Sequence, residues 1–127
     1  MVISIDFDGT CVKDKFPETG ESCPNVEKVL KRITLNGHQL ILDTVRGGEL
    51  LENAKQWFSE KRIPLWGVQE NPDQDWTDST KVDADLYIGS KYLGAILTAD
   101  FIDGQVIGKP YIDWEKVDNF IHKVYGI

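Results

Sequence analysis

Cysteine, histidine and methionine are scarce in this 127-residue chain, which contains two, two and one of them. Cys11 and Cys23 are too few for a disulfide scaffold, and no histidine spacing beside them suggests a zinc site. No apolar run approaches the roughly 20 residues that a membrane helix needs. The opening MVISIDFDGT also lacks the basic start of a secretory signal. We therefore expect reduced thiols, no membrane association and a cytoplasmic location.

Basic residues are also in deficit, with 14 Lys and Arg against 21 Asp and Glu and a formal net charge of −7. An acidic surface repels phosphate backbones, so we expect no nucleic-acid partner. The length suits one domain over residues 1–127. A domain of this size buries roughly two thirds of its unfolded surface, so it can fold without metals or disulfides.

Short apolar runs alternate with segments of helical periodicity along the chain. Strands are predicted at residues 2–7, 39–44, 65–68 and 86–88, and helices at 25–36, 49–61 and 113–125. The last helix is predicted to turn Val117, Phe120, Ile121 and Val124 inward. Asp103-Gly104 between two apolar stretches predicts a hairpin.

This alternation predicts an α/β fold, a three-layer Rossmann-like sandwich with a mainly parallel central sheet. The loop at 11–24 is too short to hold a folded cap domain, so none is expected. Ligands of such sheets bind beyond the carboxyl ends of the strands. The ends of the first, second and fourth strands are therefore the predicted functional region.

The first strand ends in Asp6-Phe7-Asp8-Gly9-Thr10, which places two carboxylates at i and i+2 beside a flexible turn. One carboxylate of such a pair can attack a phosphoryl group while the other handles a proton. Gly9 allows the backbone to approach a ligand closely. The alternative is an ordinary Asp-Gly turn after a strand.

The string DFDGT resembles Asp-x-Asp-x-Thr, the first motif of the haloacid dehalogenase superfamily, and the resemblance covers residues 2–94. It is closest to the small phosphatases of that superfamily that lack a cap domain. The resemblance implies that Asp6 is the nucleophile, which forms an aspartyl phosphate, and that Asp8 is the general acid and base. It also implies a Mg²⁺ ion bound by the Asp6 side chain and the Asp8 backbone carbonyl.

The later motifs of that superfamily imply a phosphate-binding set. Thr44, at the end of the second strand, would donate its hydroxyl, and Val45 would donate its amide. Arg46 could pair with phosphate or remain solvated at the helix entrance. Lys81 is the predicted phosphate-binding lysine, with Lys91 as the second candidate. Together with Gly9, the predicted set is Gly9, Thr44, Val45, Arg46 and Lys81.

The fourth motif departs from the resemblance, because Gly89 and Ser90 stand where the small relatives carry two metal-binding acids. Asp85 lies at the other end of the strand, some 13 Å away at ~3.3 Å per residue, and cannot replace them. Weak binding of Mg²⁺ is therefore expected. The segment 97–112 reads as an insertion, which could shield the site, make a subunit contact or be neutral.

Two functions remain open from the sequence. The first is a phosphomonoester hydrolase that acts on a small metabolite, a sugar phosphate or a nucleotide, through an aspartyl phosphate with Mg²⁺. The second is a catalytically weakened relative that binds a phosphorylated ligand or a protein partner. The intact DFDGT, Thr44 and Lys81 favour the first, whereas Gly89 and Ser90 favour the second. A homo-oligomer is left open.

Overall fold

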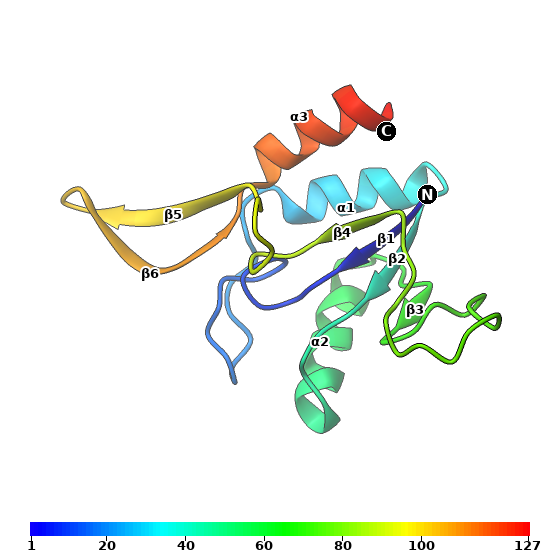
Figure 1. Ribbon diagram of the computed structural model, residues 1–127. Coiled ribbons are helices and arrows are strands. Elements are labelled where there is room, and N and C mark those ends of the chain that lie inside the picture. The colour runs from blue at the N-terminus through cyan, green and yellow to red at the C-terminus, as the bar shows by residue number, and fades with distance from the viewer.

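A four-stranded parallel sheet forms the centre of the computed structural model, which describes all residues, 1–127 (Figure 1). Its strands are β1 (Val2–Ile5), β2 (Gln39–Leu42), β3 (Gly67–Val68) and β4 (Leu86–Ile88). The spatial order is β3-β2-β1-β4, and every pairing is parallel. The predicted α/β fold with a mainly parallel central sheet is therefore confirmed.

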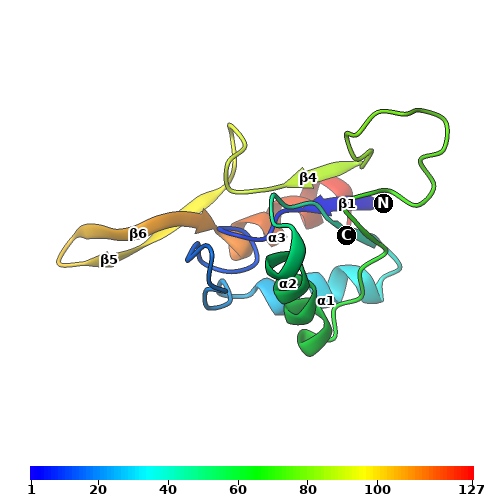
Figure 2. The ribbon, with the colours of Figure 1, turned by 90° about the horizontal axis from the view of Figure 1, so that it is seen from below.

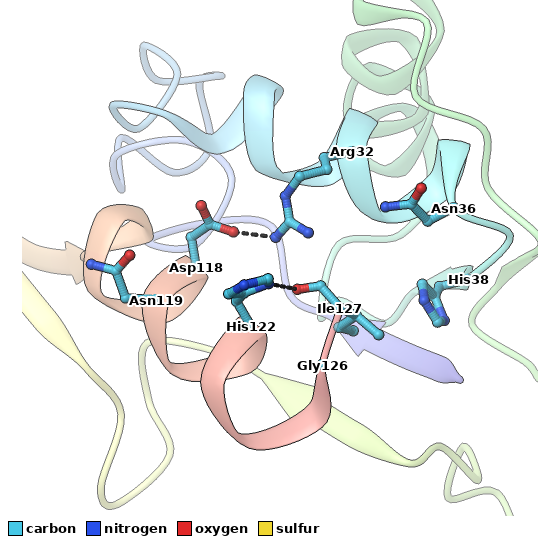
Figure 3. A pocket seen from close by; sticks show the side chains of 8 residues that line it. All are labelled: Arg32, Asn36, His38, Asp118, Asn119, His122, Gly126 and Ile127. Carbon is cyan, nitrogen blue, oxygen red and sulfur yellow. Dashed lines mark hydrogen bonds and ion pairs between the residues drawn. The ribbon is translucent and has the colours of Figure 1, made fainter.

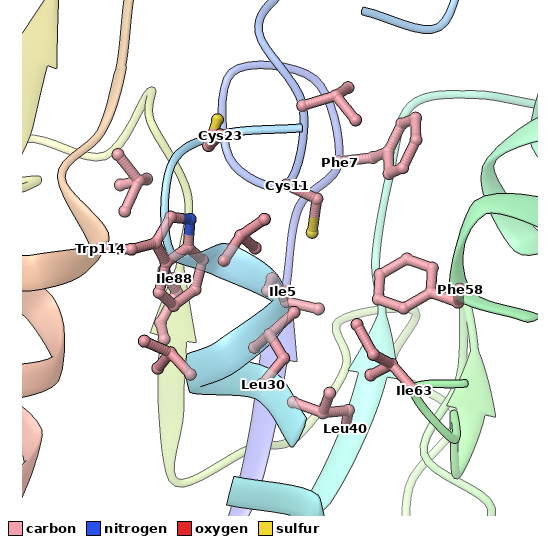
Figure 4. Packing of buried hydrophobic residues seen from close by; sticks show 14 of the residues in the cluster. Ile5, Phe7, Cys11, Cys23, Leu30, Leu40, Phe58, Ile63, Ile88 and Trp114 are labelled. Carbon is pink, nitrogen blue, oxygen red and sulfur yellow. The ribbon is translucent and has the colours of Figure 1, made fainter. Parts of the chain in front are cut away.

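Three helices connect or follow the strands, α1 (Val26–Leu35), α2 (Gly48–Lys61) and α3 (Trp114–Tyr125). Their buried residues join Ile3, Ile5, Leu40 and Leu42 in one core cluster of 22 residues (Figure 4). Alternate strand residues point to opposite faces, so these four sheet residues define a single face. All three helices therefore contribute to the core on that face.

The other face of the sheet carries Ser4 and Ile41, which are buried but lie outside the main cluster. Figure 2 shows the segment between β3 and β4 on the opposite side of the sheet from α1 and α2. In that segment Val82 is buried, and its carbonyl accepts a 2.6 Å hydrogen bond from the Tyr87 hydroxyl. No helix of the chain covers this face, so the second helical layer of a three-layer sandwich is not shown.

The turn after β1 is fixed by the start of α3. The predicted strand extended to residue 7, but β1 ends at Ile5, because the Thr10 and Cys11 amides both donate to the Phe7 carbonyl. Trp114 is 1% exposed, and its Nε1 donates to the Thr10 carbonyl at 2.7 Å. The DFDGT segment is thus a loop, and a buried tryptophan anchors it through a hydrogen bond.

The predicted inner face of α3 is half right. Val117 and Ile121 are buried, but Phe120 and Val124 are 48% and 56% exposed. Together with Trp114 at the start of the helix, Val117 and Ile121 are the residues of α3 that reach the core. The helix predicted from residue 25 does have Asn25 as its N-cap residue, but the Asn25 side chain makes no capping hydrogen bond and its φ is 68°.

The hairpin predicted around Asp103-Gly104 is confirmed as β5 (Leu97–Ile102) and β6 (Gln105–Ile112), which pair antiparallel. Figures 1 and 2 show that it projects from the body. The hairpin is anchored in the middle of β5, where Lys13 bonds to Asp100 at 2.8 Å, and at its base, where the Ile112 amide donates to the Gly9 carbonyl. None of the three helices is both long and apolar enough to cross a bilayer.

Candidate functional site

A cavity of about 290 Å³ opens at the carboxyl ends of β1, β2 and β4. Its lining comes from the residues that follow those three strands: Asp6, Asp43, Thr44, Val45, Gly89, Lys91 and Tyr92. Parallel strands end at the same edge of a sheet, so polar groups far apart in sequence meet there. The cavity lies where the sequence predicted the functional region.

Asp6 is the most perturbed carboxylate of this cavity. The pKa of Asp6 is raised from 3.8 to about 6, mainly by burial and also by the charges of Asp8 and Asp43. The Phe7 amide and the Lys91 ammonium act in the opposite direction. A partly desolvated carboxylate with a cation beside it in a cleft is a candidate reactive group.

Asp8 does not line the cavity but pairs with Arg46. Arg46 Nε donates to Asp8 Oδ2, and Arg46 Nη2 donates to Asp8 Oδ1, both at 2.8 Å. The arginine side chain is completely buried and that of Asp8 is 11% exposed. The structure therefore places the two predicted carboxylates in different surroundings: Asp6 lines the cavity, and Asp8 forms an ion pair outside its lining.

The donors predicted for phosphate differ in availability. The Gly9 amide donates to the Val12 carbonyl at 2.7 Å, and the Thr44 amide donates to Gln69 Oε1 at 2.8 Å. The Thr44 hydroxyl accepts from the Arg46 amide at 3.2 Å, which leaves its proton free for a ligand. The Val45 amide has no hydrogen-bond partner within the chain. Thr44 and Val45 are therefore the available donors at the end of β2.

The lysine in the cavity is Lys91 and not Lys81. Lys81 is exposed, lies over the Tyr87 ring at 4.9 Å and borders a separate pocket with Gln74 and Ser79. The structure therefore does not bring Lys81 together with Asp6. The second candidate from the sequence takes its place.

Gly89 lies directly beside Asp6. A Cβ added to Gly89 would be 3.4 Å from the Asp6 Cβ and 2.8 Å from a ring carbon of Tyr92. The phenol ring of Tyr92 thus fills the space that a side chain at position 89 would need. Ser90 also lies close to the first motif, since a Cβ on Gly9 would lie 2.5 Å from the Ser90 hydroxyl oxygen.

The side chains that line the cavity suit weak binding of a metal cation. No three acidic, histidine or cysteine side chains gather closely enough to hold a metal ion. The carboxylates of Asp6 and Asp43 do line the same cavity, and Mg²⁺ is often bound by one or two carboxylates with water on its other positions. The residues present therefore fit weak Mg²⁺ binding better than a tight site.

Sequence reasoning missed two residues of this region. Asp43 adds a second carboxylate to the cavity, and its position directly before Thr44 was the available signal. Gln69 bonds to the Thr44 amide and carbonyl and to the Arg46 carbonyl, and so holds the loop after β2. No sequence pattern indicated Gln69, because its contacts are with backbone 23 to 25 residues away.

A larger polar cavity of about 580 Å³ lies between α1 and α3 (Figure 3). Arg32 and Asp118 pair with each other across it, and His122 Nδ1 lies 3.3 Å from the Ile127 carbonyl oxygen. Its two histidines face no nucleophile or acid cluster. The smaller cavity at the strand ends therefore remains the candidate site.

One solved structure resembles the whole chain, that of a conserved protein from Bacteroides thetaiotaomicron. The two chains are 31% identical, the match covers 97% of this chain and 90% of the other, and the TM-score is 0.77. Neither a family model nor a curated protein matches the sequence.

Proposed function

The chain belongs to the same family as the conserved Bacteroides thetaiotaomicron protein, and we propose that it is a phosphomonoester hydrolase of the haloacid dehalogenase superfamily. The observation that carries this proposal is the cavity at the strand ends, where Asp6, the Thr44 hydroxyl and Lys91 converge. A carboxylate, a neutral donor and a cation are the groups that a phosphoryl transfer through an acyl phosphate requires.

In the proposed reaction, a carboxylate oxygen of Asp6 attacks phosphorus and the bond to the leaving oxygen breaks. Asp8 gives a proton to that oxygen. Asp8 then removes a proton from a water that attacks the aspartyl phosphate, which releases inorganic phosphate and restores Asp6. Thr44, Val45 and Lys91 would hold the phosphoryl oxygens meanwhile, with Lys91 in the role predicted for Lys81.

We further propose Mg²⁺ as the cofactor, held by the side chain of Asp6 with the Asp8 carbonyl, and assisted by Asp43. When bound, the ion screens the negative charge of Asp6 from the incoming phosphate. The fold would be a three-layer sandwich without a cap, in which the segment between β3 and β4 takes the place of the second helical layer. The substrate would be a small phosphorylated metabolite, a sugar phosphate or a nucleotide.

A catalytically weakened binding protein is the second candidate, and Gly89 and Ser90 favour it. Turnover of a panel of phosphomonoesters with and without Mg²⁺ separates the two. Release of inorganic phosphate that depends on Asp6 supports the hydrolase. Tight binding of a phosphorylated ligand without turnover supports the alternative.

Vanadate binding tests the assignment of the lysine. We expect Lys91→Ala to weaken vanadate binding about 10- to 100-fold, since a hydrogen bond to a charged group contributes about 1.5–3 kcal/mol. Lys81→Ala is the matched control and should change the dissociation constant less than twofold. Calorimetric titration measures both variants. A loss with Lys81→Ala alone would return the role to the lysine predicted from the sequence.

The fourth motif can be repaired at the position that faces Asp6. We expect Gly89→Asp with Ser90→Asp to raise Mg²⁺ affinity and turnover at least tenfold, because loss of even an outer-shell partner typically costs 10–100-fold. The new aspartate needs the space of the Tyr92 ring, which is 54% exposed and free to swing outward.

Calorimetry and Mg²⁺-dependent thermal stabilisation measure the repair independently of activity. Tyr92→Ala alone is the control, since it opens the same space without adding a ligand. If the wild-type protein already binds Mg²⁺ in the micromolar range, or the two aspartates change nothing, the fourth motif is not the weak point.

A further inference from the structure

Arg46 is the least exposed charged side chain of the protein and lies next to the proposed site. The residue is 2% exposed, and its side chain is fully buried. Burying a cation is costly unless it is paired and hydrogen-bonded, so such a position is explained only by its partners.

Four of the five N–H groups of Arg46 are engaged. Two donate to the carboxylate of Asp8, one Nη2 hydrogen donates to the Glu18 carbonyl at 2.8 Å, and Nη1 donates to the Leu50 carbonyl at 3.3 Å. The guanidinium carbon also lies 5.0 Å and 5.4 Å from the ring centroids of Phe7 and Phe16. One side chain thus joins the first motif, the loop over it and the first turn of α2.

These contacts leave Arg46 unsuited to bind phosphate itself. The residue does not line the cavity with Asp6, and its donors are already directed at Asp8 and two carbonyls. The bidentate contact instead fixes the orientation of the Asp8 carboxylate relative to the guanidinium. Each of those oxygens keeps a second lone pair, on which a proton can be held.

We propose that Arg46 is a positioning residue that acts on the reaction through Asp8 and is not a phosphate ligand. The inference rests on the proposed hydrolase function. It predicts that loss of Arg46 lowers kcat, because Asp8 and the loop containing Glu18 lose their fixed arrangement. KM and the affinity for vanadate should remain within threefold, because the groups that contact phosphate are intact.

A double-mutant cycle over Asp8 and Arg46 tests the proposal. In the wild-type background, Arg46→Met should lower kcat for an alkyl phosphate at least tenfold. In an Asp8→Asn background the same change should lower it less than threefold, because the residue through which Arg46 acts is already lost. Arg32→Met is the matched control: it breaks an Arg–Asp pair between α1 and α3, away from the site, and should leave kcat unchanged.

Chemical rescue addresses variants that fold poorly. Arg46→Ala leaves a cavity shaped for a guanidinium, so methylguanidinium should restore kcat at least fivefold. The same addition should restore nothing in an Asp8→Asn, Arg46→Ala protein.

The outcomes are distinct. A raised KM or weakened vanadate binding in Arg46→Met would make Arg46 a phosphate ligand, and equal losses in both backgrounds would make it merely structural. Either result overturns the inference and leaves the hydrolase standing. Absence of wild-type turnover on every phosphomonoester would remove the proposed function first, and the inference with it.

Discussion

Asp6→Asn is expected to reduce phosphatase activity to the level of the buffer control and at the same time to stabilise the folded protein. The activity is lost because an amide cannot form an acyl phosphate and is a poor metal ligand. Asp6 faces the cavity, whereas the other carboxylate of the first motif is turned to Arg46. Asp8 is therefore not placed to replace it as the nucleophile.

The gain in stability follows from the environment of Asp6. Burial raises the pKa of its carboxyl from 3.8 to about 6, so the folded state holds the proton more tightly than the unfolded state does. Ionised Asp6 therefore destabilises the fold above pH 6, and this cost is absent below about pH 4. One pKa unit corresponds to about 1.4 kcal/mol, so we expect a gain of about 1–3 kcal/mol at pH 8 from the neutral asparagine.

Denaturant unfolding at pH 4 and pH 8, together with turnover, measures both effects. Asp85→Asn is the matched control, because this exposed aspartate lies outside the cavity at the other end of β4. The control should keep its activity and gain nothing at pH 8. Turnover that survives in a clean Asp6→Asn preparation would exclude Asp6 as the nucleophile.

The sheet and the location of the site were predictable because both follow from local patterns. Apolar runs such as the one before Asp6 mark buried parallel strands, and the carboxyl ends of such strands meet at one edge. Asp6 and Thr44 are therefore brought together as the sequence implied. Val45 and Gly89 complete the same edge.

The interaction partner of each polar side chain could not be predicted, because the partner depends on the path of the loops. Lys81 and Lys91 both lie near β4, but the segment before the strand places Lys81 over the Tyr87 ring, and the turn after it places Lys91 in the cavity with Asp6. For Arg46 the sequence left two readings open, a contact with phosphate and a solvated side chain at the helix entrance, and neither anticipates a buried ion pair. Its burial depends on Asp8, which is 38 residues away in the chain.

Asp8→Asn should slow the reaction about 10²–10⁴-fold on an alkyl phosphate, since proton transfer to a poor leaving group contributes that much. An aryl phosphate should behave differently, because a phenolate departs without a proton. We expect a burst of one equivalent of phenolate, followed by slow release of phosphate. The burst arises because Asp8 is also needed to activate the water that hydrolyses the aspartyl phosphate.

A folding defect must be separated from this chemical effect. Asp8→Asn leaves the buried Arg46 cation without its counterion, and breaking such a pair typically costs about 3–5 kcal/mol. Replacing Arg46 by Met in the same protein removes the unpaired charge and should recover most of that stability. It should not recover turnover on the alkyl phosphate. If stability and activity return together, Asp8 acts only as the counterion of Arg46, and the proton transfers belong to another group.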